Sequence, residues 1–373
     1  MDNKNKNPNV PNLRFNDHDT WIENSLQNVT SYFKSGKNIN AKMILEEGLY
    51  PVYGGNGIRG FTNTYNQDGK YILVGRQGAL CGNVRLVEGK SYVTEHGIII
   101  INNNQSTIEY LKPLLEHMHL EKESDQSAQP GLAVNKLLLL KQYFPSIENQ
   151  ERIGKLFTLL EMKIQLQNKI IEDYSLLKDS IIHQTFSMDY TKVKLSALLT
   201  EVSVRNKEEH INNVLSVSNK LGFIKQSEQF EDREVASNDT SNYKIVSKGD
   251  YAYNPARINV GSIARLIHYD KGIISPMYSC FRIDLNKITY TYFDMFLNSS
   301  SFNRQLNKRL EGSVRQCLTF EGMLSMSIEL PPIEIQKSIS DKIDMLNDII
   351  KIEIDYRTAL IKQKQYLLNN LFI

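Results

Sequence analysis

Residues 145–153 read PSIENQERI, and residues 331–339 read PPIEIQKSI. The two stretches stand 186 residues apart, and the same offset relates other identical residues: Leu132 and Leu318, Leu160 and Leu346, Lys178 and Lys364, Phe186 and Phe372. Twice this offset nearly equals the 373 residues of the chain. The sequence is therefore a tandem duplication, and each half ends in the same kind of segment.

Both terminal segments have the apolar spacing of long helices. In the first, these apolar residues fall on a and d positions of a heptad, with polar residues between: Ile153, Leu156, Leu160, Ile170, Tyr174, Leu177 and Ile181. The second has a similar stripe: Ile339, Ile343, Leu346, Ile350, Ile354, Leu360, Leu367 and Leu371. Each segment begins just after a proline, which is tolerated at a helix start but not inside a helix.

About 38 residues at a rise of 1.5 Å give a helix of roughly 55–60 Å. Two stripes of equal length favour an antiparallel coiled coil between the two helices. The alternative is a pair of amphipathic helices that each pack on a globular core.

The rest of the chain reads as mixed α/β. We expect an α+β fold of two pseudo-symmetric globular domains separated by the helices: a disordered lead-in (1–12), domain 1 (13–143), helical spacer 1 (144–189), domain 2 (190–329) and helical spacer 2 (330–373). Strands are expected at 71–74, 84–87, 91–94 and 97–101, and at 250–253, 262–267 and 278–283. Helices are expected at 107–119 and 289–309.

Composition excludes several classes of protein. The 41% apolar content rules out a disordered chain, and no run of 18 uncharged apolar residues predicts a membrane span. The 3 cysteines are widely spaced, which excludes a disulfide scaffold and indicates reduced thiols in a cytoplasm. The net charge of +2 gives no support for nucleic-acid binding by itself, because phosphate neutralisation needs a basic surface.

Motifs for catalysis are nearly absent. The sequence has no P-loop, no HExxH, no paired Cys/His at metal-ligand spacing and no GxSxG. Asn254-Pro255-Ala256-Arg257 only partly matches the Asn-Pro-Pro-aromatic motif of adenine methyltransferases, and no loop for S-adenosylmethionine precedes it. The Gly-rich runs 54–57 and 75–78 do not open convincing helices, so turns are expected there.

Polar, planar side chains cluster around these Gly-rich runs and in the matching part of the second half. Arg pairs with guanine, and Asn or Gln pairs with adenine, through two hydrogen bonds in the major groove. Glycine lets a backbone approach closely. Eleven residues are therefore candidate DNA contacts: Asn56, Arg59, Arg76, Gln77, Arg85, Tyr253, Asn254, Arg257, Asn259, Ser262 and Arg265. For any one of them, a solvated turn residue is the alternative.

The chain resembles the DNA-specificity (S) subunit of type I restriction–modification systems over nearly its whole length. The resemblance rests on PVYGGNGIRG from Pro51, ILVGRQGA from Ile72, GDYAYNP from Gly249, GSI from Gly261 and GIISP from Gly272, together with the two proline-initiated helices. Ser313-Val314-Arg315-Gln316 also matches the family, with Gln129 at the position of Arg315 in the first half. These two residues complete the candidate DNA contacts.

The resemblance implies that each globular segment is a target-recognition domain for one half of a bipartite double-stranded DNA target. It implies a non-catalytic subunit without cofactors of its own. The partners would be two modification subunits that methylate adenine and, in the complete enzyme, two restriction subunits. S-adenosylmethionine, ATP and Mg²⁺ would bind to those partners.

The chain departs from the family pattern where a glutamate usually precedes the helix glutamine. Asn149 stands there before Gln150, and Ile335 before Gln336. Two rival functions remain open: a coiled-coil adaptor with two binding domains, and a solitary DNA methyltransferase. DNA affinity that depends on sequence would exclude the first, and a chain unable to bind S-adenosylmethionine would exclude the second.

Overall fold

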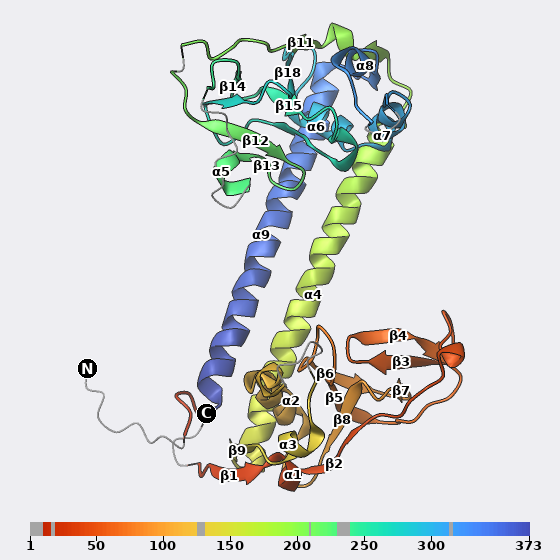
Figure 1. The fold of residues 1–373 in the computed structure, drawn as a ribbon, viewed down its shortest axis with the longest axis vertical. Helices are drawn as coiled ribbons and strands as arrows, with labels where there is room; N and C mark the ends of the chain where they lie inside the picture. Colours follow the sequence, from red (N-terminus) through yellow and green to blue (C-terminus); the bar gives the residue numbers. More distant parts are fainter. Residues whose placement is uncertain (1–9, 16–18, 125–130, 209, 230–238, 313–315) are drawn as a thin grey trace, which may run out of the picture. The chain divides into compact units, whose positions relative to one another are not determined.

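The computed structural model describes residues 10–15, 19–124, 131–208, 210–229, 239–312 and 316–373 (Figure 1). Its contacts divide the chain into two compact units. Unit 1 is Met1–Lys169 with Ile354–Ile373, and unit 2 is Ile170–Glu353. Each unit therefore contains one globular segment and one part of each long helix, whereas the division predicted from sequence kept each helix as a separate segment.

The two long helices are α4 (Ile147–Thr185) and α9 (Ile333–Leu371), with 39 residues each. Their first residues are 186 positions apart, as the repeat predicts. Both begin two residues after a proline of the repeat, Pro145 or Pro331. The prediction of two long proline-initiated helices is confirmed.

Within each unit the two helices run antiparallel and contact each other. In unit 1, the ring of Phe157 stacks on Phe372 at 5.8 Å, and the Glu161 carboxylate accepts from Lys364 Nζ at 2.7 Å. In unit 2, Lys178 Nζ donates to Asn347 Oδ1 at 3.3 Å. In unit 1, a later residue of α4 thus contacts an earlier residue near the end of the chain. The two helices are antiparallel, which confirms the coiled-coil prediction.

The predicted facing stripe is wrong at two positions. Leu177 is 48% exposed and Ile354 is 37% exposed. In α4 the inward side continues instead through Lys178 and Ile182. The sequence allowed this one-residue shift because apolar residues are adjacent at 170–171 and again at 176–177.

The globular part of unit 1 is built on two sheets and a ribbon. An antiparallel sheet has the order β2-β8-β5-β6, a second sheet has the order β4-β3-β7, and β1 pairs with β9. The strands are β1 (Ile22–Ser25), β2 (Thr30–Ser35), β3 (Tyr50–Gly54), β4 (Gly57–Thr62), β5 (Lys70–Gly75), β6 (Val84–Glu88), β7 (Tyr92–Val93), β8 (Gly97–Asn102) and β9 (Lys141–Phe144). The helices are α1 (Leu26–Val29), η1 (Ala41–Met43), α2 (Ile108–His117), η2 (Leu120–Glu123) and α3 (Val134–Leu138).

The globular part of unit 2 repeats this plan. Its antiparallel sheet has the order β11-β18-β15-β16, its second sheet has the order β13-β12-β17-β14, and β10 pairs with β19. The strands are β10 (Lys192–Lys194), β11 (Leu199–Glu201), β12 (Val214–Ser218), β13 (Gly222–Lys225), β14 (Lys244–Ser247), β15 (Tyr251–Tyr253), β16 (Ile263–Arg265), β17 (Lys271–Ile274), β18 (Ser279–Ile283) and β19 (Ser327–Glu329). The helices are η3 (Leu195–Ala197), α5 (Gln226–Gln229), η4 (Ile258–Val260), α6 (Tyr290–Leu297), α7 (Ser300–Asn307) and α8 (Phe320–Leu324).

Of the two helices predicted inside the globular segments, one is correct and one is broken. The helix predicted at 107–119 is α2, and its N-cap Thr107 accepts from Tyr110 N. The single helix predicted at 289–309 is two helices, α6 and α7. Asn298 ends the first, and Ser299 caps the second by accepting from Phe302 N. Polar capping residues in mid-segment explain the break.

One buried glutamine joins each long helix to its globular segment. The side chain of Gln150 accepts from Thr107 N at 3.0 Å and donates to the carbonyls of Gln105 and Pro145. Gln336 makes the same three bonds, to Thr289 N and to the carbonyls of Lys287 and Pro331. The repeat in sequence is thus a repeat of hydrogen bonds.

Candidate nucleic-acid interface

The two Gly-rich runs of the first half lie against each other. Gly54–Gly57 is the turn between β3 and β4, and Gly75–Gly78 leaves the end of β5. A Cβ on Gly55 would lie 2.6 Å from the Gln77 carbonyl oxygen, and one on Gly75 would lie 2.6 Å from the Gly55 carbonyl oxygen. Only glycine allows this backbone approach, so the turn prediction is confirmed and the glycines have a packing reason.

The polar candidates of the first half gather around this junction. Asn56, Arg59 and Gln77 are exposed, whereas Arg76 and Arg85 are partly buried. The Arg85 guanidinium lies close to Gly57, where a Cβ would come within 2.8 Å of its Nη1. Two segments far apart in sequence thus present one surface of amide and guanidinium groups.

Local hydrogen bonds hold part of this surface in place. Gln77 Oε1 lies 2.8 Å from His96 Nδ1, and Arg76 Nε donates to the Leu132 carbonyl at 3.3 Å. His96 was not among the sequence candidates, because it lies beyond β7 and only the fold brings it to Gln77. Arg76 is partly committed to the backbone, so Arg59 is the freer guanidinium for an external ligand.

In the second half, the loop after β15 carries the candidates. Asn254 Oδ1 accepts from Ala256 N at 3.0 Å in a tight turn, and Arg257 and Asn259 are exposed beyond it. Asn254 and Arg257 line a cavity of about 370 Å³ with Gln226, Met277 and other residues. This loop follows β15. The matching strand of the first half is β5, which the Gly75–Gly78 run follows.

Three sequence candidates are buried: Asn254, which is 7% exposed, Tyr253 and Ser262. Tyr253 is fully buried in the central strand β15, its hydroxyl donates to the Leu318 carbonyl, and burial raises its pKa to about 12. Ser262 is 4% exposed and donates to the Val217 carbonyl. In this conformation all three side chains are buried, which corrects their predicted placement.

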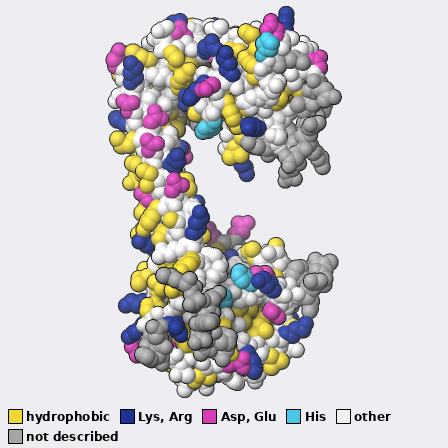
Figure 2. All heavy atoms as spheres, turned by 90° about the vertical axis from the view of Figure 1, so that its left-hand side faces the viewer, with side chains coloured by type: hydrophobic (Ala, Val, Ile, Leu, Met, Phe, Trp, Pro, Cys, Tyr) yellow, Lys and Arg dark blue, Asp and Glu magenta, His cyan; other side chains and the backbone are white. Residues whose placement is uncertain are grey.

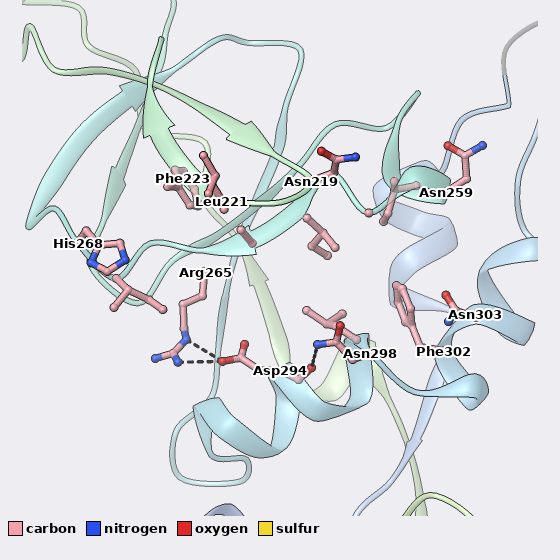
Figure 3. Close-up of a pocket in the computed structure, with 17 residues that line it drawn as sticks. Asn219, Leu221, Phe223, Asn259, Arg265, His268, Asp294, Asn298, Phe302 and Asn303 are labelled. Atoms are coloured by element: carbon pink, nitrogen blue, oxygen red, sulfur yellow. Dashed lines mark hydrogen bonds and ion pairs between the residues drawn. The ribbon is translucent and has the colours of Figure 1, made fainter. Parts of the chain in front are cut away.

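Arg265 is exposed on one side only. Its Nε and Nη2 donate to Asp294 Oδ2 at 3.1 and 2.8 Å (Figure 3). The guanidinium lies 4.6 Å from the Tyr290 ring centroid. Tyr251 donates to the other Asp294 oxygen at 2.7 Å. Burial raises the pKa of Asp294 despite the arginine. Arg265 therefore supports the fold as well as lining a cavity.

That cavity has a volume of about 420 Å³ and an amide-rich rim. Figure 3 shows Asn219, Asn259, Asn298 and Asn303 around it, with His268 near Arg265. Of these, sequence reasoning selected only Asn259 and Arg265. The others lie in the β12–β13 turn, after β16, at the C-cap of α6 and in α7, where no motif marks them.

Two candidates, Gln129 and Arg315, lie outside the described residues. Among the residues that the structure does describe, no group of three or more His, Cys, Asp or Glu could hold a metal ion. Within the same residues, every helix is too short or too polar to cross a bilayer.

A family model decides the relationship. The model described as the type I restriction modification DNA specificity domain matches residues 18–173 and again residues 199–363. The chain belongs to the type I DNA-specificity family. Two matches in one chain agree with the two pseudo-equivalent halves, and they give this specificity subunit a DNA-recognition role in restriction–modification complexes.

Curated relatives carry the same description. The chain is 41% identical over 143 residues to the EcoprrI specificity subunit of Escherichia coli, a match covering 37% of this chain and 35% of the relative. It is 24% identical over 322 residues to the putative MjaX specificity subunit of Methanocaldococcus jannaschii, covering 77% and 73%. The first match thus spans about a third of the E. coli protein.

Solved structures show the fold. An S subunit from M. genitalium superposes with a TM-score of 0.67 at 16% identity, covering 98% of this chain and 99% of that one. A chain from a study of type I complex assembly and conformational transition gives a TM-score of 0.54 at 13% identity, covering 94% and 96%.

Proposed function

We propose that this chain reads a bipartite double-stranded DNA target, one half-site with each globular segment. The observation that supports this most is the repeated Gln150/Gln336 anchor, which joins each long helix to the N-cap threonine of the matching helix, α2 or α6, in both halves. The loops that follow β5 and β15, which are matching strands of the two halves, carry different polar residues. A common frame with different loops suits two readers of different sequences.

The reading surfaces proposed are the junction of Gly-rich runs in the first half and the loop after β15 in the second. Asn56, Arg59 and Gln77 serve the first half-site, and Arg257 and Asn259 serve the second. All five are exposed, and their planar groups match base edges in the major groove. Tyr253, Asn254 and Ser262 are left out because they are buried.

Two modification subunits are the proposed partners on the long helices. Leu159 and Leu166 are exposed on α4, and Met345 and Ile352, 186 positions later, are exposed on α9. Figure 2 shows hydrophobic side chains interspersed with charged ones along the helical part of the molecule. Because the exposed apolar positions repeat with the fold, two copies of one protein can use them equivalently.

Chemistry is proposed to lie outside this chain. S-adenosylmethionine would bind to the modification subunits, and ATP and Mg²⁺ to restriction subunits where these join. The net charge of +2 fits a subunit that supplies base contacts while its partners supply much of the phosphate clamp. The site of action would be the cytoplasm, where the host DNA lies.

Selection from random DNA tests the proposal. The chain co-purified with its modification subunit should enrich duplexes with two short constant blocks and an unread gap of fixed length. Enrichment without any sequence preference would favour the adaptor alternative. Binding of S-adenosylmethionine by the pure chain would favour the solitary methyltransferase.

A further inference from the structure

A groove in unit 2 lies between the end of α4 and the start of α9. Its volume is about 490 Å³. The floor is apolar, with Ile181, Met188, Ile335 and Ile339, and the rim carries Gln184, Glu334 and Lys342. Ile335 is 40% exposed and Met188 is 52% exposed.

The equivalent place in unit 1 is covered by the chain itself. Leu13 N donates to the Asn370 carbonyl at 2.8 Å, and Asn12 bonds the Asn370 side chain. Farther along, Asp19 accepts from Asn149 Nδ2 at 2.6 Å and from Ser146 N at 3.3 Å. Asn12 and Leu13 thus contact the end of α9, and Asp19 contacts the start of α4.

Residues 186 positions apart differ in exposure, because the chain covers the groove of unit 1 and leaves that of unit 2 open. Asn149 is 7% exposed, whereas its counterpart Ile335 is 40% exposed. Ile153 is 1% exposed, whereas Ile339 is only partly buried. The polar residue is therefore buried and the apolar one exposed, the reverse of what solvent alone would favour.

The chain cannot cover the second groove in the same way. In unit 1 the segment arrives from a stretch that precedes β1, whereas in unit 2 the chain passes from α4 to β10 in six residues, Phe186–Thr191. Met188 and Tyr190 of this short link line the groove but leave Ile335 40% exposed.

We infer that the unit 2 groove binds an extended terminal segment of a modification subunit, in the position that Asn12, Leu13 and Asp19 occupy in unit 1. This inference rests on the proposed docking of modification subunits along the helices. The unit 1 segment places Leu13 on the core of its unit. The bound segment would likewise place an apolar side chain over Ile335 and Ile339.

The two grooves also specify different chemistry. Asp19 uses the Ser146 N–H and the Asn149 amide, but Pro332 and Ile335 at the matching positions offer neither donor. Lys342 replaces Leu156 on the rim. The bound segment should therefore carry a carboxylate for Lys342, and an apolar residue where unit 1 has Asp19.

Site-specific photocrosslinking tests this inference. A benzoylphenylalanine at position 335 should crosslink to a terminal segment of the co-purified modification subunit. The same probe at position 149 should crosslink to residues 12–19 of its own chain. Crosslinks from 335 to a second copy of this chain, to the folded body of the partner, or to nothing would overturn the inference.

Affinity gives a second readout. Ile335→Asp should weaken binding of the modification subunit by at least about tenfold, because the groove loses its apolar floor. The variant should fold normally, since position 335 is exposed and lies in the first turn of α9, where an acidic residue is favourable. Leu285→Asp, at another exposed apolar site of unit 2, is the control and should bind normally.

Failure of the groove and failure of the docking proposal look different. If the modification subunit binds tightly but neither crosslinks at 335 nor responds to Ile335→Asp, only the groove is wrong. If the modification subunit does not bind the unmodified chain, the proposed docking itself fails.

Discussion

The two halves of this chain hold their long helices with the same glutamine but with different charges. In unit 1, Lys364 of α9 pairs with Glu116 and Glu161 at 2.7 Å each, and Lys112 joins the same two carboxylates. The corresponding residues of unit 2 are Lys178, Asn298, Asn347 and Asp294. There Lys178 and Asn347 meet at 3.3 Å, and Asn298 Nδ2 donates to the Asp294 carbonyl at 2.8 Å, with no ion pair among the four.

The comparison separates what the fold requires from what it tolerates. The glutamine satisfies a helix N-terminus and two carbonyls in a buried place, and both halves keep it. The charged cluster joins α2, α4 and α9 of unit 1, and unit 2 has no such cluster at the corresponding four residues. Asp294, which stands at the position of Lys112, pairs with Arg265 beside the cavity of unit 2.

The largest expected effect is the loss of either anchor. Gln150→Ala and Gln336→Ala should each lower the free energy of unfolding by about 3 kcal/mol, because each leaves a threonine N–H and two carbonyls without their partner. Denaturant unfolding with hydrogen exchange should place the loss in unit 1 for the first and in unit 2 for the second. Gln365→Ala, on an exposed face of α9, should change little. Clearly unequal losses of unfolding free energy for Gln150→Ala and Gln336→Ala would contradict the equivalence of the two anchors.

Loss of one guanidinium in each half should affect one half-site only. Arg59→Ala and Arg257→Ala should each reduce discrimination at one position by about 1–3 kcal/mol. Competition binding of the assembled complex with half-site variants measures this. A uniform loss for every sequence would instead make the arginine a phosphate contact.

The cap of α4 exists in unit 1 alone. Asp19→Ala should lower the free energy of unfolding by about 1–2 kcal/mol, because the Ser146 N–H and the buried Asn149 amide lose their acceptor. Thermal unfolding of the variant measures the loss. Asp355→Ala, on an exposed face of α9, is the control and should change the midpoint little. An equal shift of the unfolding midpoint in Asp19→Ala and Asp355→Ala would show that Asp19 does not cap α4.

The smallest effect concerns the charged cluster. Lys364→Ala should lower the free energy of unfolding by about 1 kcal/mol, since the pairs are only partly buried, and Lys178→Ala by less than about 0.5 kcal/mol. Similar losses for the two lysines would show that the cluster adds nothing to unit 1.

The cluster also predicts a pH dependence. Burial opposes ionisation of Glu161, but Lys112 and Lys364 outweigh it and lower its pKa. A lowered carboxyl pKa gives stability that is present above the unfolded value of about 4.5 and lost as pH falls through the folded one. Between pH 7 and pH 4 the unmodified chain should therefore lose more stability than Lys364→Ala. Parallel curves would contradict this.

Sequence predicted the repeat, the long helices and most central strands, because prolines and apolar periods are local signals. It misplaced the helix stripe where Ile170 and Ile171 stand side by side. It placed Tyr253, Asn254 and Ser262 on a surface because a polar side chain at the end of an expected strand does not reveal whether the fold covers it. His96 and the asparagines of the unit 2 cavity were missed because only the fold brings them together.

The predicted lead-in also ends sooner than expected from sequence. Residues 1–9 lie outside the described part, but Asn12 and Leu13 contact Asn370. Nothing in an Asn- and Lys-rich run signals such a contact. It is this contact that distinguishes the covered groove of unit 1 from the open groove of unit 2.

The central claim is that two pseudo-equivalent halves each read one half of a single DNA target. A map of adenine methylation in the host genome, with and without this gene, tests it most directly. The account predicts that deletion removes one bipartite motif, two short blocks around a fixed unread gap, and that Arg257→Ala relaxes one block only. A map that keeps every motif after deletion, in cells that express the modification subunit, would contradict it.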